Sequence, residues 1–316
     1  MQLRSRIESR GCRCALWLWL GLAASAAFAA SPRPPIVGVS HIAVYASDPS
    51  ATERFYVHDL GATGGTDPEG GRGRRYYFSA VQFVEVLPLP KGPSSINRLD
   101  HIAFATPDAE ALRRYLASAG IRVPDAVTTT PEDSWFEVRD PEDNRVQFVQ
   151  SRAAPTIGLS TRRLSDHIIH VGFIVHDRAL EDGFYRRVLG FRPYWFGGNE
   201  NDKPTWISQQ VPQGSDWLEY MLVEPARGRG IPSDMSSTLL GIFDHFSLGV
   251  ANMEAVYTRL WNEERLAGQE GTPKIGRDAK WQLNLHDPDG TRAEIMELHA
   301  IGKPCCSPFT ATDPVR

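Results

Sequence analysis

The chain has 316 residues, of which 41% are hydrophobic, and it carries a formal net charge of −4. This length allows one large domain or two of ordinary size, and eight Trp, nine Tyr and fourteen Phe exclude a chain that is disordered throughout. A mildly acidic chain without clustered Lys and Arg is not expected to bind nucleic acid.

Residues 1–30 are predicted to be an export signal. Arginines come first, an apolar run follows at 15–22, and small residues end the segment at Ala29. The apolar run is shorter than the roughly 20 residues that a helix needs to cross a bilayer, although an uncleaved N-terminal anchor is the alternative. We therefore expect an exported protein, periplasmic or secreted, with no membrane contact after cleavage.

Removal of this signal leaves two cysteines, Cys305 and Cys306, in the tail formed by residues 300–316. Two adjacent cysteines near a C-terminus do not make a disulfide framework, even though export permits oxidation. We interpret them as a feature of the tail and not as a site. The fold is then expected to depend on its hydrophobic cores and on any bound metal.

The rest of the chain is predicted to contain four copies of one unit, in which a strand is followed by a helix and then by three more strands. Two copies fill residues 36–150, a linker rich in Ala, Pro, Gly and Ser covers 151–166, and two further copies fill 167–299. Repetition of this order along a chain is the signature of a repeated supersecondary unit. The predicted fold class is α+β, with four βαβββ units forming two paired domains.

Matching offsets support the repeat. Phe55 lies 14 residues after His41, and Phe184 lies 14 residues after His170. The second and fourth units share a different mark, because each opens with an Asp-His pair that contains His101 or His245.

Each unit also places one or two polar residues in otherwise apolar strands. The metal ligands predicted for the second pair of units, which we take as the principal site, are His170, Glu219, His245 and Glu294. The corresponding residues of the first pair are His41, Glu85, His101 and Gln147. Imidazole nitrogens with carboxylate oxygens suit Fe²⁺, Zn²⁺, Ni²⁺ or Mn²⁺.

Two choices follow from the chemistry of these residues. His167 and His170 differ by three positions and face opposite sides of a strand, so only one can point into the site, and His170 has the 14-residue offset. Gln147 is a neutral and weaker ligand than Glu294, so the first pair is either a second metal site or a degenerate structural copy.

The repeats resemble the vicinal oxygen chelate superfamily, which includes glyoxalase I, extradiol dioxygenases, methylmalonyl-CoA epimerase, and fosfomycin- and bleomycin-resistance proteins. The resemblance covers residues 36 to about 299 and rests on the four strand histidines, the Phe-Tyr helices, and Asp287-Pro288-Asp289-Gly290 before Glu294. It implies cup-shaped sheets around a divalent metal that chelates neighbouring oxygens of a small-molecule substrate. The resemblance is also compatible with a homo-oligomer.

Three activities are compatible with this resemblance. A glyoxalase or epimerase type would use four protein ligands, with Glu219 or Glu294 as the base that moves a proton. An extradiol dioxygenase type would use His170, His245 and Glu294, but such enzymes place a Tyr where this chain has Asn284, and the segment 274–278 contains no His. The third type sequesters a ligand without metal, between aromatic walls for which the candidates are Trp195, Phe196, Trp206, Trp217 and Trp281.

Overall fold

The computed structural model describes residues 32–91, 98–152, 157–224, 231–232 and 244–314. The predicted export signal therefore lies outside the described residues, as does part of the predicted linker. Residues Arg33–Arg316 belong to one unit of the chain. None of the described helices is long and apolar enough to cross a membrane.

Four βαβββ units follow one another, as the sequence predicted. The first contains β1 (Gly38–Ala46), α1 (Pro49–Glu53), the π-helical continuation η1 (Arg54–Asp59), β2 (Thr63–Thr66), β3 (Arg74–Tyr77) and β4 (Phe83–Pro88). The second contains β5 (Leu99–Ala105), α2 (Ala109–Ser118), β6 (Thr128–Thr129), β7 (Asp133–Arg139) and β8 (Arg145–Ser151).

The third and fourth units repeat this order. The third contains β9 (Ile168–Val175), α3 (Arg178–Asp182), its π-helical continuation η2 (Gly183–Val188), β10 (Arg192–Gly197), β11 (Trp206–Gln210), β12 (Trp217–Glu224) and a short β13 (Ile231–Pro232). The fourth contains β14 (His245–Val250), α5 (Met253–Asn262), β15 (Lys274–Ile275), β16 (Trp281–His286) and β17 (Arg292–Glu297).

Helices α1, α2, α3 and α5 each begin after a residue whose side chain caps them. The carboxylates of Asp48, Asp108 and Asp177 accept hydrogen bonds from backbone N–H groups of the first helical turn, and the Asn252 amide oxygen does the same. Such caps satisfy donors that have no partner within the helix, so a capping residue at the same place in every unit fixes where the chain turns from strand to helix.

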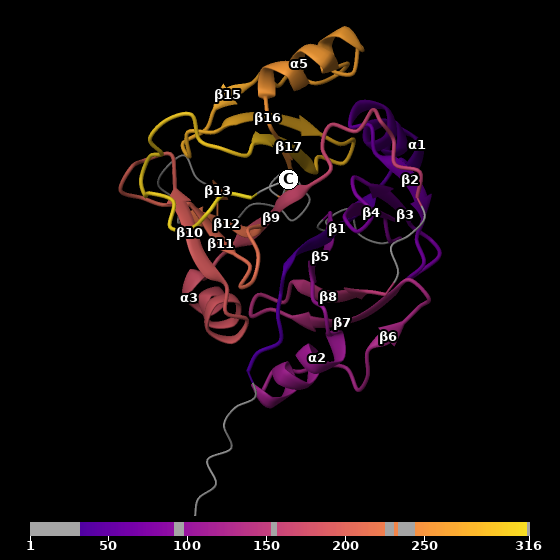
Figure 1. The fold of residues 1–316 in the computed structure, drawn as a ribbon, viewed down its shortest axis with the longest axis vertical. Helices are drawn as coiled ribbons and strands as arrows, with labels where there is room; N and C mark the ends of the chain where they lie inside the picture. The colour runs from indigo at the N-terminus through magenta and orange to yellow at the C-terminus, as the bar shows by residue number, and fades with distance from the viewer. Residues whose placement is uncertain (1–31, 92–97, 153–156, 225–230, 233–243, 315–316) are drawn as a thin grey trace, which may run out of the picture. The chain divides into compact units, whose positions relative to one another are not determined.

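Two curled sheets result, one from each pair of units (Figure 1). Their strand orders are β2-β3-β4-β1-β5-β8-β7-β6 and β10-β11-β12-β9-β14-β17-β16-β15, with β13 beside β12. Within a unit the first and last strands pair in parallel, and the two units of a sheet meet at the antiparallel pairs β1–β5 and β9–β14. The predicted architecture of paired units is thus confirmed.

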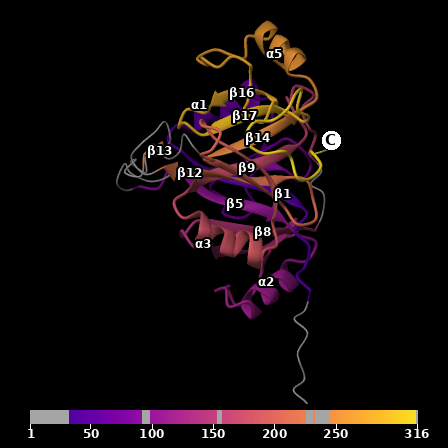
Figure 2. The ribbon, with the colours of Figure 1, turned by 90° about the vertical axis from the view of Figure 1, so that its left-hand side faces the viewer.

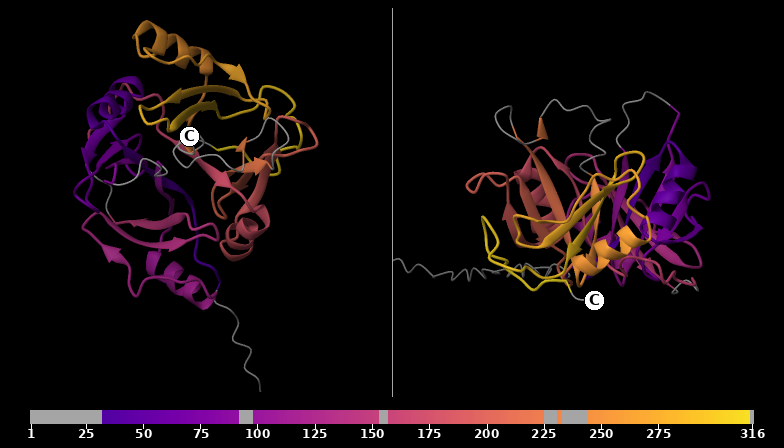
Figure 3. Two further views of the ribbon diagram at one scale, coloured as in Figure 1. Left: turned by 180° about the vertical axis from the view of Figure 1, so that it is seen from behind. Right: turned by 90° about the horizontal axis from the view of Figure 1, so that it is seen from above.

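Strand alternation separates an apolar face of each sheet from a polar one. Ile42, Ile102, Val171 and Phe246 belong to a buried core that also contains residues of the helices. This core includes residues of both halves of the chain, and β1 and β9 lie side by side between them (Figure 2). Helices α2 and α5 pack on strands β7–β8 and β16–β17, and the left view of Figure 3 shows both helices at the periphery.

Two of the sequence motifs bind the halves to each other. The Tyr56 hydroxyl in η1 donates to the Asp287 carboxylate at 3.1 Å, and the Tyr185 hydroxyl in η2 donates to Asp140 at 3.2 Å. Burial raises the pKa of both carboxyls to about 6. The Phe-Tyr pairs and the Asp-Pro turns therefore lie in the core and not on the polar faces. They connect the first unit with the fourth and the second unit with the third.

Candidate metal centres

The C-terminal sheet brings all four predicted ligands together on its polar face. The Nε2 atoms of His170 and His245 lie 3.1 Å apart. His170 Nε2 lies 3.2 Å from a Glu294 carboxylate oxygen, and His245 Nε2 lies 3.1 Å from a Glu219 oxygen. His170, His245 and Glu294 form a group able to hold a metal ion, and all three are buried.

The chain places these residues by strand alternation and register. Glu219 pairs with Gly172 on the neighbouring strand, and Gly172 pairs in turn with His245. His167 is directed elsewhere, because its Nε2 lies 2.8 Å from Asp216. The preference for His170 over His167 therefore agrees with where the two side chains point.

Gly172 is a residue of the site that the sequence reasoning missed. A Cβ atom there would lie 2.0 Å from Cε1 of His245, so the imidazole packs directly on the backbone of β9. The equivalent residue of the first unit is Ala43, which pairs with His101. Aligning the repeats would have shown this Gly-for-Ala difference beside the predicted ligands.

The two carboxylates of this centre differ in their proton affinity. Burial alone would raise the pKa of Glu294, but the hydrogen bond with His170 and the charge of Arg292 lower it to about 2. Burial raises the pKa of Glu219, and the charge of Glu294 adds to the effect. Neighbouring carboxyls whose pKa values are driven apart can divide the roles of permanent anion and proton acceptor.

The donor set fits a divalent cation. Two ligands bound at about 2.1 Å in adjacent positions of an ion lie about 3 Å from each other, which is close to the three distances found here. Without a cation, two imidazole nitrogens would face each other beside two carboxylates in a buried site, an arrangement that leaves charge uncompensated. The buried Nδ1 of His170 has no hydrogen-bond partner, and its ring packs on Trp217 with centroids 4.5 Å apart.

A cavity of about 550 Å³ opens beside this centre. Glu219 and Glu294 line it, and its aromatic residues are Tyr194, Trp195, Trp206, Trp217 and Phe309. Three of the five aromatic wall residues predicted from the sequence are therefore in place. Phe196 is instead 41% exposed and Trp281 packs against the main core, so neither is among the residues that line the cavity.

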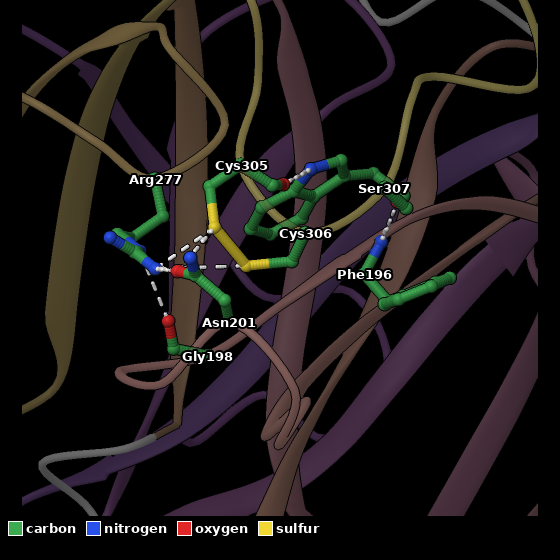
Figure 4. The surroundings of a disulfide bond; sticks show 8 residues. Phe196, Gly198, Asn201, Arg277, Cys305, Cys306 and Ser307 are labelled. Atoms are coloured by element: carbon green, nitrogen blue, oxygen red, sulfur yellow. Dashed lines mark hydrogen bonds between the residues drawn. A yellow bond between two sulfur atoms is a disulfide. The ribbon is translucent and has the colours of Figure 1, made fainter.

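The predicted tail packs against the third and fourth units and contributes Phe309 to the cavity wall. Cys305 and Cys306 form a disulfide with each other (Figure 4). The Arg277 side chain, which also lines the cavity, lies against this disulfide and donates to Asn201 and, at 3.2 Å, to the Gly198 carbonyl. The backbone carbonyl of Arg277 accepts a hydrogen bond from the Cys305 N–H at 2.7 Å. The tail therefore fixes the loop between β15 and β16.

The N-terminal sheet repeats the arrangement with one decisive difference. His41 and His101 approach within 2.9 Å at Nε2, and together with Glu85 they form a second buried group of the same kind. The Gln147 amide donates to Glu69 at 2.8 Å, and its buried oxygen has no partner. His101 also lies 2.7 Å from Asp100 through Nδ1.

The difference is Arg75, which is 2% exposed and already occupies the carboxylates of this centre. Its Nε donates to Glu85 at 3.1 Å, and its other nitrogens pair with Glu69 and, at 3.2 Å, with Asp133. Burial opposes the charged form, yet the carboxylates of Glu85 and Glu69 raise the pKa of Arg75. A divalent cation at this centre would have to compete with the fixed positive charge of Arg75 for the Glu85 carboxylate, which is not so at the C-terminal centre.

The structure also shows what stands in the place of Arg75 at the other centre. Arg75 pairs in register with Glu85, and Ser208 pairs in register with Glu219. The sequence reasoning compared the ligands themselves and missed this position on the neighbouring strand.

Fold and site together define a protein with paired βαβββ units and a cluster of histidine and carboxylate donors in each sheet. A model of the Glyoxalase/Bleomycin resistance protein/Dioxygenase superfamily matches residues 38–148 and 167–295. The chain belongs to this superfamily, which confirms the resemblance found in the sequence. No curated protein matched the chain.

Solved structures with the same fold include three 2,3-dioxygenases. A catechol 2,3-dioxygenase matches with a TM-score of 0.63 at 12% identity, over 89% of this chain and 92% of the other. Homoprotocatechuate 2,3-dioxygenase from Brevibacterium fuscum, in complex with 3,4-dihydroxyphenylacetate, matches with a TM-score of 0.61 at 16% identity, over 88% and 85%. The 2,3-dioxygenase LapB from Pseudomonas sp. KL28 matches with a TM-score of 0.60 at 12% identity, over 90% and 98%.

Proposed function

We propose that this protein is a divalent-metal-dependent enzyme that acts, at the C-terminal centre, on a small substrate with two neighbouring oxygens. The observation that carries the proposal is the convergence of His170, His245, Glu219 and Glu294 through contacts of 3.1–3.2 Å beside a cavity that the two glutamates line. A bound metal would polarise a substrate oxygen and stabilise negative charge that develops on it.

The residues of the chain would then divide the work. Glu294, with a pKa of about 2, stays ionised as a ligand together with the two histidines. Glu219 has a raised pKa and lines the cavity, so its carboxylate is suited to take a proton from the substrate and return it. Proton transfer of the isomerase type is therefore the reaction that we favour.

Ring cleavage is the second candidate, and the fold shared with extradiol dioxygenases favours it. His170, His245 and Glu294 would be the three ligands, and Glu219 would be a neighbour of the metal. Among the described residues, no histidine outside the metal centre lines the cavity, and Asn284 occupies a position that the sequence comparison assigned to a tyrosine in such enzymes.

Export is a further part of the proposal and rests on the N-terminal sequence alone. A glutathione adduct is a cytosolic substrate, so export of the enzyme would exclude it as the substrate. Expression with residues 1–30 present, followed by N-terminal sequencing of the product and fractionation of the cells, tests it. Intact protein in the cytoplasmic fraction would overturn export without affecting the metal centre.

The first test of the enzyme is metal content by elemental analysis, measured on the wild type and on two double variants. We expect His245→Ala with Glu294→Ala to abolish bound metal, and His41→Ala with His101→Ala to leave it unchanged. Oxygen uptake with catechols by the Fe²⁺-loaded protein would establish ring cleavage in place of isomerisation. Wild type that binds no metal after reconstitution with Fe²⁺, Mn²⁺, Ni²⁺ or Zn²⁺ would overturn the proposal and leave metal-free ligand sequestration.

A further inference from the structure

We propose that Arg292 is the anion-binding residue of the C-terminal cavity. The substrate would be a planar molecule that has two oxygens on adjacent atoms and a carboxylate close to them. This inference rests on the proposed function for the site at which the substrate reacts, and it adds the class of substrate and the residue that selects it.

Arg292 is placed to touch a molecule bound at the centre. It opens β17 two residues before Glu294, so both side chains leave the same face of the strand, and both line the cavity. On the neighbouring strand, Arg292 pairs in register with His245. The guanidinium therefore borders the two ligands that the fourth unit supplies.

The equivalent arginine of the N-terminal half is fully occupied, and this contrast carries the argument. Arg145 pairs in register with His101 as Arg292 does with His245. Arg145 donates to Asp100 at 2.7 Å and to Glu137 at 2.7 Å. Its charge is neutralised within the protein.

Neither of these partners is available to Arg292. Glu137 pairs in register with Gln147, and the residue that pairs with Glu294 in the same way is Asn284, which is neutral. Asp244 occupies the position of Asp100, but it forms no ion pair with Arg292. Within the described part of the chain no carboxylate pairs with Arg292, and its buried Nε has no hydrogen-bond partner.

The net charge of the metal-loaded cavity also favours an anionic substrate. Glu219 and Glu294 balance a divalent cation, and the other charged residues that line the cavity are Lys274, Arg277, Asp278, Lys280 and Arg292. Lys280 pairs with Asp313 at 2.8 Å and Arg277 donates to the neutral acceptors Asn201 and Gly198, so these residues leave an excess of positive charge. A guanidinium binds a carboxylate through two parallel hydrogen bonds, and it does so most strongly where water is partly excluded.

The shape of the substrate is indicated by the opposite wall. The Trp217 ring covers His170, is 3% exposed and lines the cavity, and its buried Nε1 has no partner. Trp195 and Trp206 extend this aromatic surface. Flat aromatic walls favour planar ligands, and the indole N–H offers one further donor to a substrate oxygen.

Calorimetric titration of the Zn²⁺-loaded protein tests the inference with matched probes. These are 2,3- and 3,4-dihydroxybenzoate, each compared with the corresponding dihydroxybenzamide, which keeps the ring and both hydroxyls but has no charge. We expect wild type to bind at least one acid about 10- to 100-fold more tightly than its amide. Arg292→Gln should remove this preference and change affinity for the amide by less than about threefold.

Two further variants make the result specific. Arg292→Lys keeps the charge and should retain part of the preference, whereas Arg145→Gln, the matched change in the other half, should leave the preference as in wild type. Equal binding of acids and amides by wild type, equal loss of both in Arg292→Gln, or no binding of any probe would overturn the inference.

Metal content of the same samples separates this inference from the proposed function. A wild type that binds no metal but prefers the acids through Arg292 would overturn the metal-dependent function and keep the anion site. A wild type that binds metal at His170 and His245 without preferring the acids would overturn the anion site and keep the metal-dependent function.

Discussion

The two halves of this protein have the same strand order, the same pair of histidines and the same first carboxylate, but the charged residues around them differ. In the N-terminal half Arg75 holds Glu85, whereas in the C-terminal half the corresponding neighbour is the neutral Ser208. Conversely, Arg145 is neutralised while Arg292 is not. The same His, His and Glu positions on a repeated fold therefore do not guarantee identical sites, because residues on the adjacent strands decide whether the carboxylate is available.

The largest effect is expected from Arg75→Ser, which copies the C-terminal half into the N-terminal one. Loss of the guanidinium leaves Glu69, Glu85 and Asp133 buried without a cation, and we expect unfolding free energy to fall by about 3–5 kcal/mol. Added Zn²⁺ should recover much of this loss by binding the folded state, with a second equivalent of metal per chain.

Denaturant unfolding with and without Zn²⁺ measures both effects of Arg75→Ser. The control is Arg74→Ser on the same strand, where an exposed pair with Glu53 is removed and less than about 1 kcal/mol should be lost. A destabilised variant that gains no stability from Zn²⁺ would show that Arg75 is not what keeps metal from this centre.

The reverse exchange, Ser208→Arg, should empty the C-terminal centre. A unit charge about 4 Å from a ligand opposes a cation by up to about 4 kcal/mol near a protein surface, which corresponds to a loss of roughly 100- to 1000-fold in metal affinity. Competition with a chelator of known affinity measures this. Ser208→Ala, which adds no charge, should lose less than about tenfold, and an equal loss in both variants would contradict the electrostatic explanation.

A smaller effect is expected where the backbone positions a ligand. Gly172→Ala places a Cβ 2.0 Å from the present position of His245, so the imidazole must move and metal affinity should fall by about 10- to 100-fold. Ala43→Gly, the matched change in the first unit, should cost about 1 kcal/mol of stability and leave metal content unchanged. Unchanged metal affinity in Gly172→Ala would show that this close contact does not position His245.

The smallest effect is expected in helix α3, at a position where the third and first units differ away from the metal centres. Glu181 in α3 is fully buried where α1 has Thr52, and burial with the nearby charges of Asp140 and Glu142 raises its pKa to about 9. Because the folded pKa is raised, this carboxyl favours folding most below its unfolded pKa of 4.5, and that contribution is lost as pH rises toward 9.

Glu181→Gln should therefore be more stable than wild type at pH 8, by about 1–2 kcal/mol, and should unfold with a flatter pH profile between pH 5 and pH 9. Glu181→Thr, which copies the first unit, should show the same flattening. Thermal unfolding across this range provides the measurement, and a wild-type stability that does not fall between pH 5 and pH 9 would contradict it.

Much of the fold could be predicted from the sequence because its signals are local and repeated. The offset from His41 to Phe55 recurs from His170 to Phe184, and strand alternation then places the polar residues of every unit on one face. For the same reason the eight candidate ligands could be named from the sequence. Trp281 and Phe196 were wrongly assigned to the cavity because an aromatic residue in a strand can fill a core, a wall or the surface, and the pattern is the same in each case.

What the sequence determined by itself is the repeat and the family, and it named the candidate ligands, since these depend on residue types at fixed offsets. The tertiary structure decided which centre has its carboxylate engaged by an arginine. Arg75 and Glu85 are ten residues apart in sequence, and only the pairing of β3 with β4 brings the guanidinium onto the carboxylate. It also decided that Arg292 lacks the partners of Arg145, because charge compensation is set by what packs across neighbouring strands and not by the order of residues along one of them.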